Sequence, residues 1–145
     1  MPSTSLIPQA HQAPALKSVV PPLGLATLRV LVVEDDPELQ WRLARMLTVQ
    51  GHRVVGTSSG EGALALVGQW TVDIVLLDEH LPGLSGVELL RRLREAHPQL
   101  KVALMSRHPG SALQQLHVRA QVDAWIQKPL DRNALQAVLE RLAQR

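Results

Sequence analysis

Short apolar runs alternate with stretches of helical periodicity from residue 28 to the end of this 145-residue chain. The runs that predict strands cover residues 28–33, 53–55, 72–77, 100–105 and 122–126. Between them, apolar residues recur at helical spacing, as at Leu39, Leu43 and Leu47. Because a parallel strand pair needs a crossover connection, usually a helix, this alternation predicts an α/β fold with a parallel sheet wrapped by helices on both faces.

Capping residues predict where the helices begin. The signals are Asp36 before Pro37, Ser58 with Glu61, Ser85 with Glu88, and Asp131. The first three helices are expected to end at Gly51, about Val67 and about Ala96. A short polar helix is expected over residues 111–119, before the fifth strand.

Composition narrows the class of protein. With 46% apolar and 19% charged residues, the chain is typical of one soluble globular domain. The absence of Cys excludes disulfides and thiolate sites, and the absence of Phe and Tyr argues against a base-stacking RNA surface. The densest basic group, Arg91, Arg92 and Arg94, is interpreted as a solvated helix face, so direct nucleic-acid binding is not expected.

The N-terminal segment differs from the rest. Residues 1–28 hold five of the ten Pro residues and a single charged side chain, Lys17. We therefore expect a flexible Pro-rich leader over 1–27 and one folded domain over 28–145. Prolines interrupt any signal-peptide core, and no stretch is long enough to span a membrane. The chain is expected to be cytoplasmic and to have no membrane partner.

Four of the predicted strands are followed by polar residues whose chemistry is complementary. The first leads into Glu34-Asp35-Asp36, and the third leads into Asp78. The fourth leads into Ser106 and the fifth into Lys128. If the strands are parallel neighbours, these residues meet at one edge of the sheet, where open α/β sheets build ligand sites.

The acidic cluster and the other three residues each have two interpretations. Glu34 and Asp35 suit Mg²⁺, which prefers oxygen ligands, but the alternative is that Asp36 caps a helix and its neighbours are only solvated. Asp78 could act as a carboxylate nucleophile toward phosphorus or be an ordinary turn residue. The Ser106 hydroxyl and the Lys128 ammonium group suit contacts with phosphoryl oxygens, but each residue alone could equally have a structural role.

The combined pattern resembles the receiver domain of two-component response regulators, similar to the chemotaxis regulator. The matching residues are Val32-Val33-Glu34-Asp35-Asp36-Pro37, Leu76-Leu77-Asp78, Leu81-Pro82-Gly83, Ser106 and Lys128-Pro129. This resemblance covers residues 28 to about 143. It implies a flavodoxin-like, doubly wound sheet of five parallel strands in the order 2-1-3-4-5.

The resemblance also implies roles for individual residues. Asp78 is expected to be the phosphoacceptor, and Glu34, Asp35 and Asp78 are expected to hold Mg²⁺. His80 would add its backbone carbonyl to the magnesium site. Ser106 and Lys128 would contact the phosphoryl group, and Trp125 would be an aromatic switch residue that moves with Ser106. The Lys128–Pro129 bond resembles one that is cis in the family.

Three residues near the site depart from the family pattern. Arg107 stands where a small residue is common, so it would screen the site, contact the phosphoryl group, or be exposed with neither effect. His80 and His108 occupy flanking positions that influence hydrolysis of the acyl phosphate in the family. We predict that both tune its lifetime.

Taken together, these features predict a phosphorylation-dependent signalling switch in a phosphorelay. The donor would be a sensor histidine kinase or a histidine phosphotransfer protein, and an unidentified downstream protein would read the signal. Such a domain is not a conventional enzyme, although it catalyses its own aspartyl phosphorylation and dephosphorylation. The alternative is a pseudo-receiver, a phosphorylation-independent interaction or dimerisation module. A stand-alone receiver, a fragment of a larger regulator or hybrid kinase, and a homodimer all stay open.

Overall fold

The computed structural model describes residues 27–107 and 122–144. Its sheet has five parallel strands in the order β2-β1-β3-β4-β5, as predicted. The strands are β1 (Arg29–Val33), β2 (Arg53–Thr57), β3 (Ile74–Asp78), β4 (Lys101–Ser106) and β5 (Ala124–Gln127). The described helices are α2 (Pro37–Val49), α3 (Gly60–Gln69), α4 (Gly86–Ala96) and α7 (Arg132–Ala143). The predicted leader and the predicted helix over 111–119 lie outside the described residues, apart from Thr27.

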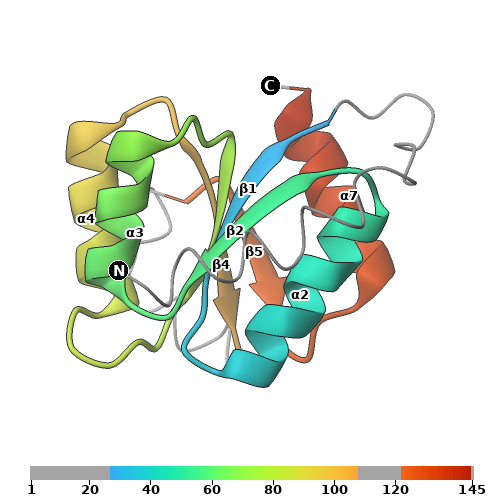
Figure 1. Cartoon of the computed structure of the whole chain (residues 1–145), viewed down its shortest axis with the longest axis horizontal. Coiled ribbons are helices and arrows are strands. Elements are labelled where there is room, and N and C mark those ends of the chain that lie inside the picture. The colour runs from blue at the N-terminus through green and yellow to red at the C-terminus, as the bar shows by residue number, and fades with distance from the viewer. Residues whose placement is uncertain (1–26, 108–121, 145) are drawn as a thin grey trace.

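Helices cover both faces of the sheet (Figure 1). Helices α2 and α7 lie on one face, and α3 and α4 lie on the other. Successive strand residues point to opposite faces. Val30 and Val32 of β1 therefore pack in the cluster with α2 and α7, whereas Leu31 and Val33 pack in the cluster with α3 and α4. Below, these are called the α2/α7 face and the α3/α4 face.

Three of the four predicted N-caps are confirmed and one is wrong. The side chains of Asp36, Ser85 and Asp131 each accept a backbone N–H of the helix that follows. The α3 helix is capped by Ser59, whose hydroxyl accepts the Gly62 N–H at 3.0 Å, and not by Ser58. Strand β2 continues to Thr57, which moves the start of the helix one residue along the chain.

Three strands, β3, β4 and β5, lie slightly later in the chain than predicted, and the shifts of β3 and β4 concern the site. Asp78 is itself the last residue of β3, and Ser106 is the last residue of β4. Both side chains are therefore buried, with 4% and 2% of their residue surface exposed. The rigid sheet, and not a turn, fixes their backbones.

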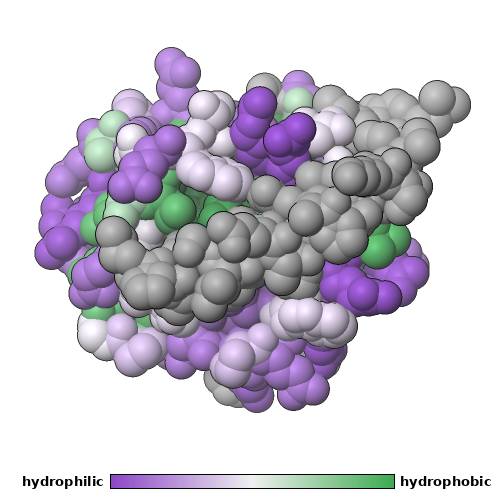
Figure 2. Space-filling view, in the orientation of Figure 1, coloured by the Kyte–Doolittle hydropathy of each residue, from purple (hydrophilic) through white to green (hydrophobic). Residues whose placement is uncertain are grey.

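The described residues that are visible on one face of the molecule are mostly polar. On the face shown in Figure 2, hydrophilic side chains predominate and hydrophobic ones form smaller areas. Trp41 and Val49 of α2 are the exposed large hydrophobic residues among those described, and the Arg45 guanidinium lies 5.6 Å from the centre of the Trp41 ring. No helix in residues 27–107 or 122–144 is long and apolar enough to cross a membrane.

Candidate functional site

Strand register brings the acidic residues together. Val33 of β1 pairs with Leu77 of β3, so the next residues, Glu34 and Asp78, are also neighbours across these strands. Both continue the series of residues that points to the α2/α7 face. Lys128 belongs to the same series on β5, after Ala124 and Ile126. One face of the sheet edge therefore receives two carboxylates and one ammonium group.

These three side chains form a compact charged cluster, which we call the triad: Glu34, Asp78 and Lys128. The Lys128 Nζ lies 2.8 Å from Glu34 Oε1 and 3.2 Å from Asp78 Oδ1. All three side chains are at most 10% exposed. In so little solvent, the charge of one partner depends strongly on the other two.

The pKa shifts in the triad follow from burial and charge. Burial raises the pKa of Glu34, and the nearby Asp78 charge acts in the same direction, while the hydrogen bond from Lys128 opposes both. Burial would lower the pKa of Lys128, but its contacts with Glu34 and Asp78 together outweigh burial and raise that pKa. Lys128 is therefore fully charged at neutral pH.

Backbone groups orient both carboxylates. The N–H of Asp36 donates to Glu34 Oε2 at 3.2 Å, and the N–H of His80 donates to Asp78 Oδ1 at 3.3 Å. Asp36 also caps α2, so it contacts the site through its backbone and the helix through its side chain. The Lys128–Pro129 bond is cis, as the resemblance implies.

Gln40 of α2 supports the site and was missed by sequence reasoning. Its buried side chain donates from Nε2 to the carbonyl oxygens of Glu34 and Thr57, at 2.7 and 3.0 Å. These bonds fix the ends of β1 and β2 next to the acidic cluster. A polar residue at an inward position of an amphipathic helix was the available signal.

Gly86 is a second residue that the sequence analysis overlooked. It begins α4, and a Cβ built on it would lie 2.6 Å from the backbone oxygens of both Asp78 and Glu79. Only glycine allows α4 to start so close to the end of β3. Its N–H also donates to the Glu79 carbonyl at 3.3 Å.

Three carboxylates could hold a cation. Glu34, Asp35 and Asp78 each offer an oxygen atom, and these atoms lie within 4.8 Å of one another. Glu34 and Asp78 are buried, whereas Asp35 is exposed. An all-oxygen donor set open to water on one side fits Mg²⁺, which usually keeps several water ligands.

Ser106 is oriented differently from the triad. It continues the β4 residues that point to the α3/α4 face, as do Val102 and Leu104. Its hydroxyl donates to Glu79 Oε1 at 2.5 Å. Trp125 pairs with Leu104 in the sheet and is partly buried against the same core cluster.

Two of the three remaining predicted residues, His80 and Arg107, lie in the described part of the chain. The His80 side chain is 79% exposed, and its Nε2 lies 3.9 Å from Glu79 Oε1. Arg107 is exposed. His108 falls outside the described residues.

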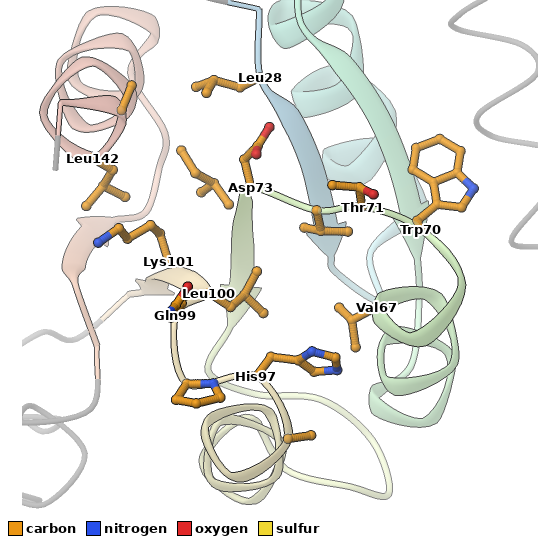
Figure 3. A pocket seen from close by; sticks show the side chains of 15 residues that line it. Leu28, Val67, Trp70, Thr71, Asp73, His97, Gln99, Leu100, Lys101 and Leu142 are labelled. Atoms are coloured by element: carbon orange, nitrogen blue, oxygen red, sulfur yellow. The ribbon is translucent and has the colours of Figure 1, made fainter.

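A cavity lies at the opposite edge of the sheet from the charged cluster. It measures about 710 Å³ and is lined by residues at the starts of strands and the ends of helices, among them Leu28, Trp70, His97 and Leu100 (Figure 3). The acidic residues sit at the other ends of the strands. This cavity and the acidic cluster are therefore separate features of the fold.

Residues 30–140 match the family of response regulator receiver domains. The chain belongs to this family. The match includes the four strand ends singled out above, and membership implies a histidine kinase partner in general.

Relatives of this receiver domain include regulators and a sensor protein. It is 32% identical to the transcriptional regulatory protein AfsQ1 of Streptomyces coelicolor over 116 residues, which are 80% of this chain and 51% of that protein. It is 41% identical to the virulence sensor protein BvgS of Bordetella pertussis over 88 residues, 61% of this chain and 7% of that protein. The chain thus spans about half or less of these relatives.

A solved structure has the same fold. The receiver domain of the sensor histidine kinase PA1611 from Pseudomonas aeruginosa matches with a TM-score of 0.76 and 25% identity. The match covers 83% of this chain and 100% of that one. That structure holds a magnesium ion in its active-site cleft.

Proposed function

We propose that this receiver domain is a phosphorylation-dependent signalling switch that accepts a phosphoryl group from a phosphohistidine onto Asp78. The observation that carries the proposal is the triad. A buried carboxylate at the end of a rigid strand is oriented by a backbone N–H and lies 3.2 Å from the Lys128 ammonium. A site that only stabilised the fold would have little need to bury two neighbouring carboxylates.

In the proposed transfer, a carboxylate oxygen of Asp78 forms a bond to phosphorus while the phosphorus–nitrogen bond of the phosphohistidine breaks. The products are an aspartyl phosphate and a histidine, whose ring nitrogen takes up a proton from solvent. The protein supplies position and charge and little covalent chemistry beyond the nucleophile. Lys128 neutralises charge on the transferring group.

Glu34, Asp35 and Asp78 would hold Mg²⁺, with the backbone carbonyl of His80 as a further ligand. Bound magnesium would supply a positive charge that neutralises phosphoryl oxygens. Without it, the Asp36 and His80 N–H groups and Lys128 keep the two buried carboxylates in place.

We propose that the phosphorylated state is read through Ser106 and Trp125. New contacts between Ser106 and the phosphoryl group would favour a second arrangement of the segment that follows it. Trp125 lies on the same face of the sheet, so its environment would change with that arrangement. His80, Arg107 and His108 would tune the lifetime of the acyl phosphate.

The proposed partners are a sensor histidine kinase or a histidine phosphotransfer protein as donor and a downstream protein as target. The proposed folded unit is residues 28–145, preceded by a Pro-rich leader. A stand-alone receiver, a receiver within a larger regulator or hybrid kinase, and a homodimer are all compatible with this proposal.

The test is phosphorylation by a small acyl phosphate donor with Mg²⁺, followed by intact mass. We expect one phosphoryl group on the wild type and none on Asp78→Asn. Asp73→Asn is the matched control. Asp73 directly precedes the first residue of β3, at the end of the strand away from the site, and its carboxylate accepts the Arg29 N–H. That variant should be phosphorylated like the wild type.

Two results would contradict the proposal. A gain that persists in Asp78→Asn would show that another residue is the acceptor. No gain in the wild type, under conditions that phosphorylate a control receiver domain, would favour the phosphorylation-independent interaction module instead.

A further inference from the structure

Strand register places Glu79 beside Ser106. Asp78 of β3 pairs with Met105 of β4. Glu79, which follows Asp78, and Ser106, which follows Met105, are therefore neighbours. The Glu79 N–H extends this ladder by donating to the Met105 carbonyl at 3.0 Å. Both side chains point to the α3/α4 face, opposite to the triad.

The position of Glu79 is fixed on every side. Its N–H is bonded to Met105, and its carbonyl accepts the Gly86 N–H at 3.3 Å. The residue is only 9% exposed, and its Oε1 accepts the Ser106 hydroxyl at 2.5 Å. A short hydrogen bond to a buried carboxylate is of the strong, charge-assisted kind.

A serine hydroxyl has one proton to donate. While Ser106 donates to Glu79, it cannot donate to a phosphoryl oxygen on Asp78. The backbones of both residues are held in the sheet, so the choice between the two acceptors is made by rotation of the Ser106 side chain.

We propose that Glu79 is a positioning residue that holds Ser106 away from the phosphoryl site and so slows phosphorylation of Asp78. This inference rests on the proposed function. Phosphorylation requires Ser106 to leave a charged acceptor, and the Glu79 carboxylate must then find another donor. The exposed His80 imidazole, 3.9 Å from the same oxygen, is the neighbour available for that role.

The experiment compares initial rates of phosphorylation in Glu79→Met and in the wild type, with an acyl phosphate donor and Mg²⁺. Met has a similar volume and removes the acceptor. We expect the rate of mass gain to rise about tenfold, because one charge-assisted hydrogen bond corresponds to at least that factor. Glu79→Gln keeps a weaker, neutral acceptor and should give an intermediate rate. Glu61→Met, on the exposed surface of α3, is the control and should leave the rate unchanged.

The Ser106→Ala background separates positioning from simple charge repulsion. If Glu79 acts through the hydroxyl, Glu79→Met has no effect on the rate when Ser106 is absent. If Glu79 only repels the incoming phosphate, the increase persists in that background, and the inference is wrong. Urea unfolding of the wild type, Glu79→Met, Ser106→Ala and the double variant gives an independent readout. If the two residues are bonded, the shifts in unfolding midpoint of the single variants do not add up to that of the double variant. Additive shifts would also contradict the contact.

The remaining outcomes distinguish this inference from the proposed function. Phosphorylation of the wild type with an unchanged rate in Glu79→Met and Glu79→Gln overturns only the role of Glu79. A mass gain seen in Glu79→Met but hardly in the wild type supports it strongly. No mass gain in any variant overturns the proposed function, and the role of Glu79 with it.

Discussion

Substitution of Lys128 by Met should strongly destabilise the fold in magnesium-free buffer. Met keeps most of the volume of the side chain and removes the ammonium group. The variant leaves Glu34 and Asp78 buried next to each other without a neutralising charge. The substitution therefore isolates the electrostatic part of the triad.

The distances give the size of the effect. At an effective dielectric constant of about 20, a charge pair at 2.8 Å attracts by about 6 kcal/mol and one at 3.2 Å by about 5 kcal/mol. The two carboxylates, whose ligand oxygens lie within 4.8 Å, repel by about 3.5 kcal/mol or more. Desolvation of all three groups offsets much of this attraction. Removing one partner of a buried pair lowers the free energy of unfolding by about 3–5 kcal/mol, and we expect a loss in that range.

The assay is urea unfolding at pH 7.5, followed by circular dichroism, with and without Mg²⁺. The control is Lys101→Met, because Lys101 is also partly buried but lies at the start of β4, on the opposite edge of the sheet. It should change the free energy of unfolding by less than about 1 kcal/mol. Magnesium should raise the free energy of unfolding more in Lys128→Met than in the wild type, because the variant has the larger uncompensated negative charge.

Two results would refute this reasoning. A loss below about 1 kcal/mol in Lys128→Met would mean that the carboxylates are not held against each other as the distances indicate. A loss of the expected size that also appears in Lys101→Met would point to a general effect of replacing Lys on the sheet.

Three further predictions concern residues around the core. Burial lowers the pKa of His52, so as the pH falls the unfolded state binds a proton at a higher pH than the folded state does. The free energy of unfolding should therefore fall below about pH 6.5, by up to about 1.4 kcal/mol per pH unit. Urea titrations at pH 7.5 and 5 measure how much the free energy of unfolding falls between the two pH values. This fall should be smaller in His52→Asn than in the wild type, but unchanged in His97→Asn, whose histidine is half-buried; an equal fall in both variants would contradict the prediction. Gly86→Ala should destabilise by about 1–3 kcal/mol because its Cβ meets two backbone oxygens, whereas Gly68→Ala, with no atom within 4 Å of its Cβ, should stabilise α3 by about 0.5–1 kcal/mol in thermal melts. Gln40→Leu removes two buried hydrogen bonds and should lower the free energy of unfolding by about 2 kcal/mol; a neutral effect would show that the carbonyls of Glu34 and Thr57 find other donors.

Local signals predict the order of the elements along the chain and the residues that end each strand, whereas the order of the strands within the sheet comes from the resemblance to receiver domains. Apolar runs and caps such as Asp36 with Pro37 give the element order, and short connections restrict the topology. The same reasoning places the α3 cap at Ser58, because Ser58 with Glu61 has the spacing of a capping box, whereas Ser59 with Gly62 does not. The actual cap depends on where β2 ends. That point is decided by pairing with β1, which no local pattern contains.

The supporting residues were missed for a related reason. Gln40 and Gly86 lie in helices whose periodicity is unremarkable, and their importance comes from atoms of distant strands. Gln40 reaches the carbonyl of Thr57, 17 residues away, and Gly86 meets the oxygens of Asp78 and Glu79. Such contacts depend on how closely a helix approaches the sheet, which is a property of packing.

Sequence also leaves open which face of the sheet each side chain takes. The four strand ends meet at one edge, but a shift of one residue moves a side chain to the opposite face. Asp78 and Lys128 point to the α2/α7 face, while Ser106 and Trp125 belong to the α3/α4 face. A signal from a phosphorylated Asp78 must therefore pass over the sheet edge to reach Trp125. In the proposed switch, the Ser106 hydroxyl would carry this signal. It would have to turn away from Glu79, which accepts its hydrogen bond on the α3/α4 face.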